Sequence, residues 1–381
     1  MRIRIYQQAQ LHHHLCPDKG LDGPEKTVQT GVKPKLRGSE DDMNGSAKVT
    51  RDTSAPFDVL TIGRSGVDVY PLQTGVGLEE VSSFAKFLGG SPMNVAVGAA
   101  KYGGRSAIIS GVGDDPFGRY VCHEMERLGV DSAFVVTNPK FHTPVAFCEI
   151  FPPDNFPLYF YRSPTTPDLE LTVNDLPEEE IARAKIFWFS VTGLSVEPSR
   201  SAHFAALKTR ARAENGPGYY TIADLDYRDM FWPSAANAHE QVQKVLAHTD
   251  VAIGNKEECQ VAVGESEPDR AADALLESGV DIAVVKQGPL GTLAKTREER
   301  IVVPVTPVKV VNGLGAGDAF GAGFCHAILE GWDLPRAVQF ASTAGAIVAS
   351  RLECSTAMPT EEEVFELIAK NPASAPAVEK R

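Results

Sequence analysis

The chain of 381 residues is poor in cysteine and has no excess of basic residues. Its six cysteines are scattered, with no C-x-x-C pair and no spacing that suits a zinc site. We therefore expect reduced thiols in a cytoplasmic protein. The 37 Lys and Arg residues against 50 Asp and Glu give a formal net charge of −13. Nucleic acid and anionic membranes bind basic faces, so neither is an expected partner.

Several sequence patterns that would assign a class at once are also missing. No apolar run reaches the roughly 18 residues of a membrane span. No internal repeat of about 20 to 50 residues occurs, and there is no Walker A loop of the form G-x-x-x-x-G-K-[ST]. A dinucleotide fingerprint on Gly313 and Gly315 fails, because its third glycine would have to replace Asp318. Any ATP that binds this chain is therefore held by a different scaffold.

The two ends of the chain differ in composition from the middle. Residues 1–55 are rich in Lys, Asp, Gly, Ser and Thr with few aromatics, so we expect a disordered N-terminal extension. Residues 371–381 are mostly Ala, Pro, Lys and Glu, and we expect a C-terminal tail. The folded domain is then predicted over residues 56–370.

Within this domain, short β-branched runs alternate with longer helical patterns, which is typical of a parallel sheet with crossover helices. Because most of the runs are apolar on both faces, the sheet should be covered on both sides. The predicted strands are Asp58 to Ile62, Ser106 to Val112, Ile186 to Val191, Tyr220 to Ala223, Val251 to Gly254 and Ile282 to Lys286. The predicted helices are Met93 to Lys101, Phe117 to Leu128, Ser199 to Glu214, Glu240 to Ala247, Asp269 to Glu277, Ala316 to Glu330 and Leu334 to Ser350. The fold class is therefore α/β.

Two segments, about residues 66–88 and 143–163, break this alternation. They hold short strand-like pieces rich in Tyr, Phe and Pro, without helices between them. They could form a small separate sheet that closes over substrate as a lid, or they could be edge strands of the main sheet.

The most informative stretch is the glycine-rich run from Val310 to Phe320. A short apolar strand leads into Gly315, Ala316 and Gly317, whose bare amides would begin a helix and suit a phosphoryl group. Asp318 follows directly, and a carboxylate at a helix N-terminus is favoured in its ionised form, ready to accept a proton. The alternative is that Asp318 only caps the helix and the glycines only form a turn.

Two separated motifs resemble the ribokinase-like sugar kinases, the PfkB family. The run Gly315 to Gly323 is similar to the family's G-A-G-D-A-F-x-A-G signature, with Gly321 at the variable position. Gly89 to Ala96 is similar to its N-terminal G-G-x-x-x-N-x-A signature. The resemblance spans about Phe57 to Ile368. It implies a three-layer α/β/α sandwich with a small β-sheet lid, and phosphoryl transfer from ATP with Mg²⁺.

The resemblance also implies roles on the sugar side of the site. Asp318 would be the catalytic base, with the amides of residues 315–317 as an anion hole. Asp68 matches the acid with which the family holds sugar hydroxyls, while Gly89, Gly90 and Asn94 would contact the sugar. From the residues alone, Asp68 is a turn former and Asn94 a residue on a helix surface.

On the nucleotide side, Asn255 to Glu258 matches the family's N-x-x-E motif, whose carboxylate organises Mg²⁺. The stretch Val284 to Gly291 resembles the turn beside the ATP phosphates, with Lys286, Gly288 and Gly291 as nucleotide-binding residues. A solvated helix start and a surface lysine are the plain alternatives. One departure concerns the loop for a monovalent cation: the family commonly has Asp and Thr where this chain has Asn312, Gly313 and Leu314. A K⁺ requirement is therefore in doubt.

The substrate predicted from these patterns is a small sugar acid. Arg162 ends an aromatic run on the suspected lid, and a guanidinium matches a carboxylate with two parallel hydrogen bonds. Arg64 and Arg228 are further candidates for this anion, although each of the three arginines could be only a salt-bridge or surface residue. Stretches around Arg64 and Asp224 to Arg228 resemble the branch of the family that phosphorylates the C6 hydroxyl of 5-dehydro-2-deoxy-D-gluconate in myo-inositol catabolism.

Three alternatives stay open at the level of sequence. The chain could be a 2-dehydro-3-deoxygluconate kinase, a fructokinase, or a sugar-binding regulator that has lost catalysis. A homodimer is also left open by the sequence.

Overall fold

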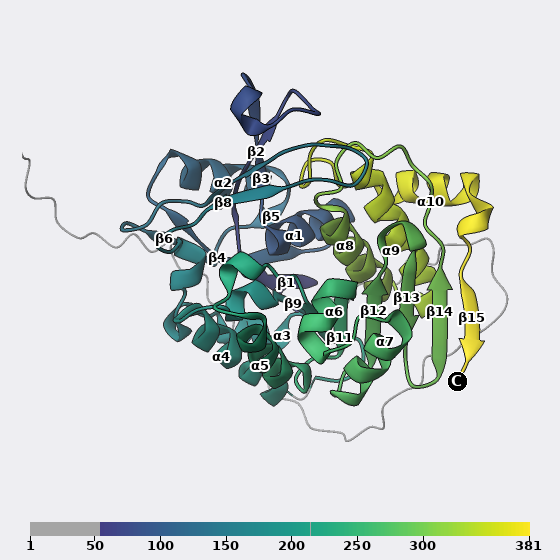
Figure 1. The fold of residues 1–381 in the computed structure, drawn as a ribbon. Helices are drawn as coiled ribbons and strands as arrows, with labels where there is room; N and C mark the ends of the chain where they lie inside the picture. The colour runs from purple at the N-terminus through teal and green to yellow at the C-terminus, as the bar shows by residue number, and fades with distance from the viewer. Residues whose placement is uncertain (1–53, 214) are drawn as a thin grey trace, which may run out of the picture. The chain divides into compact units, whose positions relative to one another are not determined.

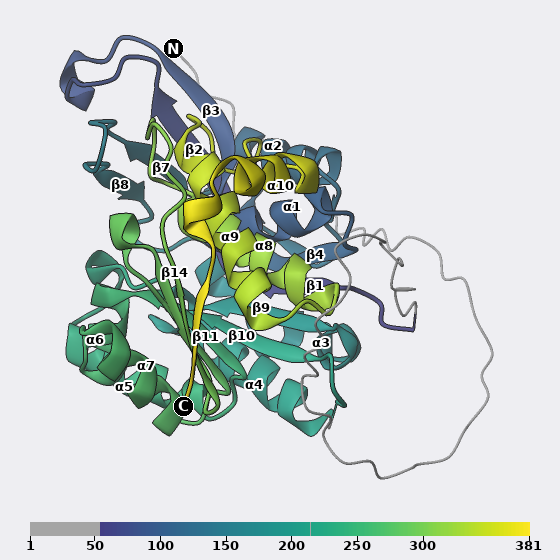
Figure 2. The same ribbon diagram turned by 90° about the vertical axis from the view of Figure 1, so that its right-hand side faces the viewer.

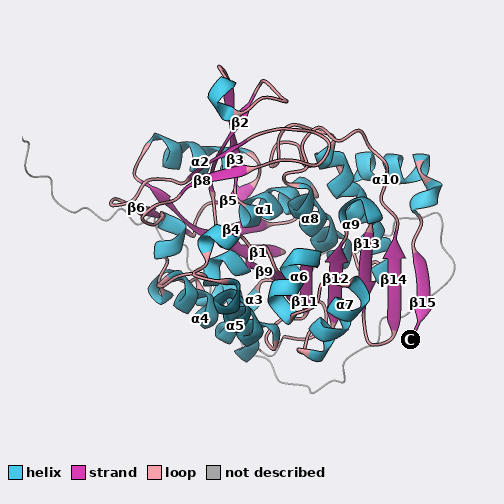
Figure 3. Cartoon of the chain, viewed as in Figure 1, coloured by secondary structure: helices cyan, strands magenta, loops and turns pink. Residues whose placement is uncertain are grey.

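The computed structural model describes residues 54–213 and 215–381, and in this part of the chain the strands form two sheets (Figures 1 and 3). The extension predicted over residues 1–55 therefore lies almost wholly outside the described residues. The larger sheet has 11 strands in the order β15-β14-β13-β12-β11-β10-β9-β1-β4-β5, with β6 also paired to β4. Strands β12 through β5 run parallel, and β13, β14 and β15 are antiparallel. The predicted α/β class is confirmed.

Every strand and helix predicted for the main sheet is present. The strands are β1 (Val59–Ile62), β4 (Ser106–Gly113), β9 (Ile186–Ser190), β10 (Tyr220–Asp224), β11 (Val251–Asn255) and β12 (Ile282–Lys286). The helices are α1 (Ser91–Lys101), α2 (Pro116–Arg127), α4 (Ser199–Arg212), α5 (Ala235–Leu246), α7 (Pro268–Glu277), α8 (Ala316–Leu329) and α9 (Leu334–Ala349). Helix α5 begins well before the predicted Glu240, because the side chain of Ser234 caps it by accepting a hydrogen bond from the amide of Asn237.

Several elements were not predicted. They are α3 (Glu178–Arg183), α6 (Lys256–Val263), α10 (Glu361–Lys370), β5 (Val130–Asp131), β6 (Val135–Asn138), β13 (Thr292–Lys295), β14 (Glu299–Val303) and β15 (Ala377–Lys380). The prediction of a tail over residues 371–381 is wrong for β15, which pairs with β14. No helix of residues 54–381, Glu214 aside, is long and apolar enough to cross a bilayer.

Strand β9 shows why the sheet is covered on both faces. Its side chains alternate in direction, so Phe187 and Phe189 pack with residues of α3 to α7, whereas Trp188 packs with residues of α1, α8 and α9. All of its residues are buried. Figure 2 shows the strands between these two helical layers, as a strand without a polar face requires.

The two irregular segments form the smaller sheet. It consists of β2 (Gly66–Pro71), β3 (Phe84–Gly89), β7 (Val145–Cys148) and β8 (Leu158–Tyr161), in the order β3-β2-β7-β8. Strands β2 and β3 pair antiparallel, and β7 joins β2 in parallel. A small separate sheet is thus confirmed over the edge-strand alternative.

Candidate active site

The carboxyl ends of four parallel strands supply side chains to one pocket of about 870 Å³. Arg64 follows β1, while Asp224, Asn255 and Lys286 end β10, β11 and β12. Strand β1 lies between β9 and β4, where the order of the sheet reverses. Ligands of open α/β sheets bind outside the carboxyl ends of the strands at such a point.

The structure brings nearly all the predicted site residues together around this pocket. Those that line it are Arg64, Asp68, Gly90, Asn94, Arg162, Arg228, Asn255, Glu258, Lys286, Gly288, Gly291, Gly315, Ala316, Gly317 and Asp318. Gly89 alone is not part of the wall. A Cβ at Gly89 would stand 2.2 Å from Cγ of Asp68, so this glycine gives the Asp68 side chain its room.

Helix α8 begins at the pocket with free amides. Its N-cap is Gly315, which has φ 78° and provides no side-chain cap. A Cβ on Gly315 would lie 2.6 Å from Sγ of Cys354, so both the left-handed backbone and the close contact require glycine. Asp318 lies in the first turn of the helix and is not its cap. The unsatisfied amides and the helix dipole make this end suitable for an anion.

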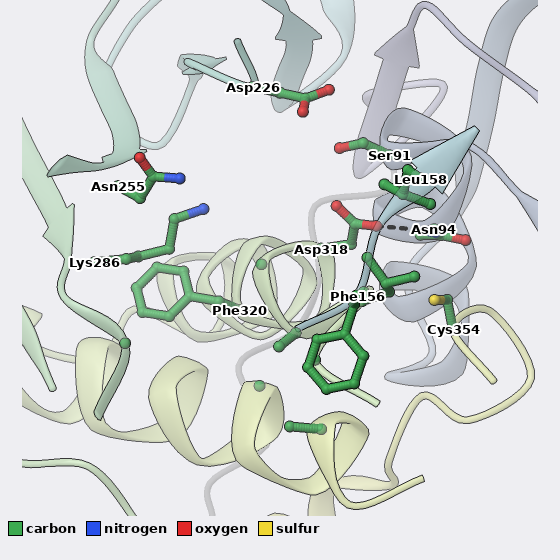
Figure 4. A pocket seen from close by; sticks show the side chains of 18 of the residues that line it. Ser91, Asn94, Phe156, Leu158, Asp226, Asn255, Lys286, Asp318, Phe320 and Cys354 are labelled. Carbon is green, nitrogen blue, oxygen red and sulfur yellow. Dashed lines mark hydrogen bonds between the residues drawn. The ribbon is translucent and has the colours of Figure 1, made fainter. Parts of the chain in front are cut away.

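The carboxylate of Asp318 is held by an amide from α1. Nδ2 of Asn94 donates to Oδ2 of Asp318 at 2.6 Å, and Figure 4 shows the other oxygen of Asp318 pointing away from Asn94. Burial raises the pKa of Asp318, while the hydrogen bond from Asn94 works in the opposite direction. The helix terminus alone would lower this pKa, so the sequence argument missed the desolvation that outweighs it.

Lys286 reaches into the space before the same helix end. Its Nζ lies 3.1 Å from where a Cβ on Gly317 would stand, and Figure 4 shows it with Asn255 across the pocket from Asn94. Burial would lower the pKa of Lys286, but carboxylates, with Asp224 the strongest, raise it. No carboxylate of the described residues forms a salt bridge with this ammonium. It is therefore a cation available to an anionic ligand.

Asn255 and Glu258 join the end of β11 to the start of α6. Oε2 of Glu258 accepts a hydrogen bond from the backbone N–H of Asn255 at 2.7 Å, and Oδ1 of Asn255 accepts one from the backbone N–H of Glu258 at 2.9 Å. The N-x-x-E pattern is thus a capping box. Glu258 is only 6% exposed and lines the pocket, so this is not the solvated helix start of the plain alternative. Burial raises the pKa of its carboxyl.

Two glycines shape the wall beside Lys286. Gly288 and Gly291 have φ values of 56° and 89°, a region that favours glycine. A Cβ on Gly291 would lie 2.2 Å from the carbonyl oxygen of Val303. The turn after β12 can therefore approach β14 only without a side chain.

Three arginines gather at one end of the pocket, each near a carboxylate. Nη2 of Arg162 donates to Asp168 at 2.7 Å, and Nη2 of Arg228 contacts Asp226 at 2.9 Å. Nη2 of Arg64 lies 3.9 Å from the same Asp226. Burial would raise the pKa of Asp226, but Arg228 and Arg64 hold it below its usual value.

These salt bridges leave part of each guanidinium unused. Nη1 of Arg64, Nε and Nη1 of Arg162 and Nε of Arg228 are buried without a hydrogen-bond partner among the described residues. The rings of Phe160 and Phe231 stack near the Arg64 and Arg162 guanidiniums, at 5.0 to 5.7 Å from ring centroid to Cζ. Buried donors are normally satisfied, so these N–H groups are open to a ligand that accepts hydrogen bonds, as Oδ1 of Asp168 and Oδ2 of Asp226 are open to a donor.

Some residues of the pocket were missed by the sequence argument. The Tyr70 hydroxyl donates to Oδ2 of Asp68 at 2.8 Å and lies 3.0 Å from Sγ of Cys354. Burial raises the pKa of Asp68 to about 6. Ser91 donates to Asp224 at 3.1 Å, and burial raises the pKa of Asp224 to about 7. The sequence does contain a signal for Tyr70, because it lies two residues after Asp68 and so on the same face of the strand. It contains no such signal for Cys354.

The loop before α8 uses its Asn312 for structure. This buried side chain donates to the carbonyl oxygen of Leu352 at 2.7 Å and accepts a hydrogen bond from the amide of Leu314 at 3.1 Å. The side chain of Asn312, at a position where the family commonly has a residue of the cation loop, thus connects the loop before α8 to the loop that contains Leu352.

Comparisons with known proteins identify the family of this chain. The pfkB family carbohydrate kinase model matches residues 57–361. The 5-dehydro-2-deoxygluconokinase of Geobacillus thermodenitrificans is 33% identical over 331 residues, which cover 85% of this chain and 97% of that protein. Two solved structures have similar folds: a putative ribokinase II from E. coli in complex with ATP and Mg²⁺ (TM-score 0.74, 23% identity, 82% and 99% coverage), and a fructokinase from Vibrio cholerae O395 with fructose, ADP and calcium ion (TM-score 0.71, 26% identity, 81% and 98% coverage). The chain belongs to the pfkB family of carbohydrate kinases.

Proposed function

We propose that this phosphotransferase, whose acceptor is an alcohol group, uses ATP to phosphorylate the C6 hydroxyl of 5-dehydro-2-deoxy-D-gluconate. The observation that carries the acid substrate is the set of buried, unpartnered guanidinium N–H groups on Arg64, Arg162 and Arg228. A neutral sugar would leave these donors without a charged partner, whereas a carboxylate accepts two parallel hydrogen bonds from a guanidinium. The 33% identity to a 5-dehydro-2-deoxygluconokinase supports the same substrate.

The reaction follows from groups at the other end of the pocket. Asp318 accepts the proton of the C6 hydroxyl, the C6 oxygen bonds to the γ-phosphorus, and the bond from that phosphorus to the ADP oxygen breaks. The amides at the start of α8 and the ammonium of Lys286 stabilise charge on the transferring phosphoryl group. Asp68 and Gly90 hold the sugar, and the smaller sheet, which carries Asp68, excludes water.

The nucleotide side of the pocket fits ATP with Mg²⁺. Asn255, Lys286, Gly288 and Gly291 would contact the nucleotide, and Glu258 would hold the ion. Proteins usually hold Mg²⁺ with one or two carboxylates, phosphate oxygens and water. This fits the finding that, within residues 54–381 except Glu214, no group of three or more His, Cys, Asp or Glu side chains could hold a metal by itself. When bound, the ion neutralises charge on the phosphates.

The test is an ADP-release assay over a panel of sugar acids and neutral sugars, with wild type and Asp318→Asn. We expect turnover of 5-dehydro-2-deoxy-D-gluconate and little of fructose. Asp318→Asn should lower kcat by roughly 10²- to 10⁴-fold, the usual contribution of a general base, while ATP affinity stays similar. Strong turnover of fructose would refute the acid substrate, and an active Asp318→Asn enzyme would refute the base.

A further inference from the structure

The amide of Asn94 is held from both of its ends. Its Nδ2 donates to Asp318, and its Oδ1 accepts a hydrogen bond from the hydroxyl of Ser355. Ser355 follows α9 and is only 1% exposed; its one hydroxyl proton has two acceptors, Oδ1 of Asn94 and the carbonyl oxygen of Leu88, which lies 2.8 Å from its Oγ. Asn94 is 3% exposed. Hydrogen bonds between side chains therefore connect Ser355 to Asn94 and Asn94 to Asp318.

These hydrogen bonds hold the amide with its N–H end facing Asp318. An amide has a donor end and an acceptor end, and only the donor end stabilises a charged carboxylate. The Ser355 hydroxyl gives the carbonyl end of Asn94 a buried partner, and consecutive hydrogen bonds polarise and strengthen each other. Without that hydroxyl, Oδ1 would be a buried acceptor with no donor, which is costly. The amide would lose one of the two hydrogen bonds that hold it, and its hydrogen bond to Asp318 would weaken.

We propose that Ser355 is a positioning residue, which fixes the Asn94 amide with its N–H end on Oδ2 of Asp318 and so leaves Oδ1 to receive the substrate proton. The inference rests on the proposed function, in which Asp318 is the base. It also gives Asn94 a role beyond contact with sugar, because one of its two N–H bonds is committed to the base. The proton from the C6 hydroxyl ends on Oδ1, while Oδ2 remains an acceptor throughout.

Other ionisable groups face Asp318 from the surrounding elements. They are Asp68 of β2, Asp224 of β10, Asp226 and Arg228 after β10, Lys286 of β12 and Cys354 after α9. None of them is hydrogen-bonded to the side chain of Asn94 or Ser355 in the described part of the chain. Removing the Ser355 hydroxyl therefore acts on Asp318 and leaves their own hydrogen bonds in place.

The experiment compares the pH dependence of kcat/KM for the sugar acid, at saturating ATP, in wild type, Ser355→Ala and Ser355→Thr. At low pH, kcat/KM falls as the base becomes protonated, and we call this part of the profile the acid limb. In Ser355→Ala the acid limb should move to higher pH by about one unit, because a hydrogen bond to the charged base is weakened. At pH values below the pKa of the base, kcat/KM should therefore be about tenfold lower than in wild type. At the higher pH of the plateau, the KM for the sugar acid should change little. Ser355→Thr keeps the hydroxyl and should keep the wild-type limb.

The matched control is Ser199→Ala, which removes a buried serine hydroxyl that donates to the carbonyl oxygen of Gly193 at 2.9 Å, outside the pocket. It should leave the limb in place. If Ser355→Ala does not fold, Ser355→Cys gives the same test with a weaker donor and a smaller shift in the same direction. A folded Ser355→Ala or Ser355→Cys enzyme with the wild-type limb overturns the proposal, as does an equal shift in Ser355→Thr. Failure of the proposed function is recognised separately, by an active Asp318→Asn enzyme.

Discussion

Substitution of Arg162 by alanine should weaken binding of the sugar acid and also destabilise the fold, for separate reasons. The side chain is 8% exposed and its Nη2 pairs with Asp168, itself 3% exposed, while Nε and Nη1 are unpartnered and buried. Losing one member of a desolvated charge pair with the substrate costs about 2 to 5 kcal/mol. The KM for the acid should therefore rise roughly 30- to 5000-fold.

The cost in stability comes from the partner that remains. Without Arg162, the carboxylate of Asp168 is buried and unpaired, which lowers the free energy of unfolding by about 3 to 5 kcal/mol. The double variant Arg162→Met with Asp168→Leu removes both charges and should recover most of that stability. Its KM for the acid should stay high, because the free donors of Arg162 are still missing.

The assay is ADP release at varied sugar-acid concentration, together with denaturant unfolding of the same preparations. Arg210→Ala is the matched control, since Arg210 is 6% exposed and donates to backbone carbonyls such as Lys185 O at 2.9 Å, outside the pocket. It should lose stability and keep the wild-type KM. If both the single and the double variant at Arg162 bind the acid with the wild-type KM, Arg162 does not contact the substrate.

Three further predictions concern the same pocket. The Gly315→Ala enzyme should lose most of its activity, because alanine is strained at φ 78° and its Cβ would lie 2.6 Å from Sγ of Cys354. The control is Gly331→Ala, which has a similar φ of 71° but open space around its Cβ; it should be less stable yet keep kcat. Equal activities of the two variants would contradict the role of the Gly315 turn. Lys286→Met should lower kcat and move the acid limb to higher pH, because the cation that favours the nearby carboxylates in their charged form is gone. The control is Lys244→Met, at an exposed lysine. An unchanged rate and pH profile would remove Lys286 from the site. Since the pKa of Asp68 is raised from 3.8 to about 6 in the folded chain, its burial costs stability as pH rises through that window. Asp68→Asn should therefore gain melting temperature relative to wild type above pH 6 and not below the unfolded pKa, and a difference that does not vary with pH would show that Asp68 does not titrate in this way.

The sheet could be predicted because its strands are apolar on both faces, which is a local signal. Helix α10 also had a signal: Thr360 and Glu363 form a capping box, and the T-x-x-E pattern can be found in the sequence. Strand β15 had none, since all four of its residues are exposed and only the edge of β14 gives them a partner.

The site could be predicted in its parts and only partly in its connections. The glycine-rich turn and the ends of the strands mark where a phosphoryl group would bind, because the backbone there must be bare. Contacts across the chain leave no such mark: Ser355 and Asn94 are 261 positions apart, and Tyr70 and Cys354 are 284 apart. The raised pKa of Asp318 was missed for the same reason, since burial depends on what packs around a residue and not on its neighbours in sequence.

The antiparallel pairing of β15 with β14 bears on how the protein should be handled. Removing residues 371–381 would uncover the backbone amides and carbonyls of β14, a template on which another chain could add a strand. Asp273 would also lose its contact with Arg381, at 2.6 Å. Affinity tags and fusion partners should therefore not replace residues 371–381, and shortened versions that end at Lys370 are expected to precipitate more readily than the chain that keeps β15.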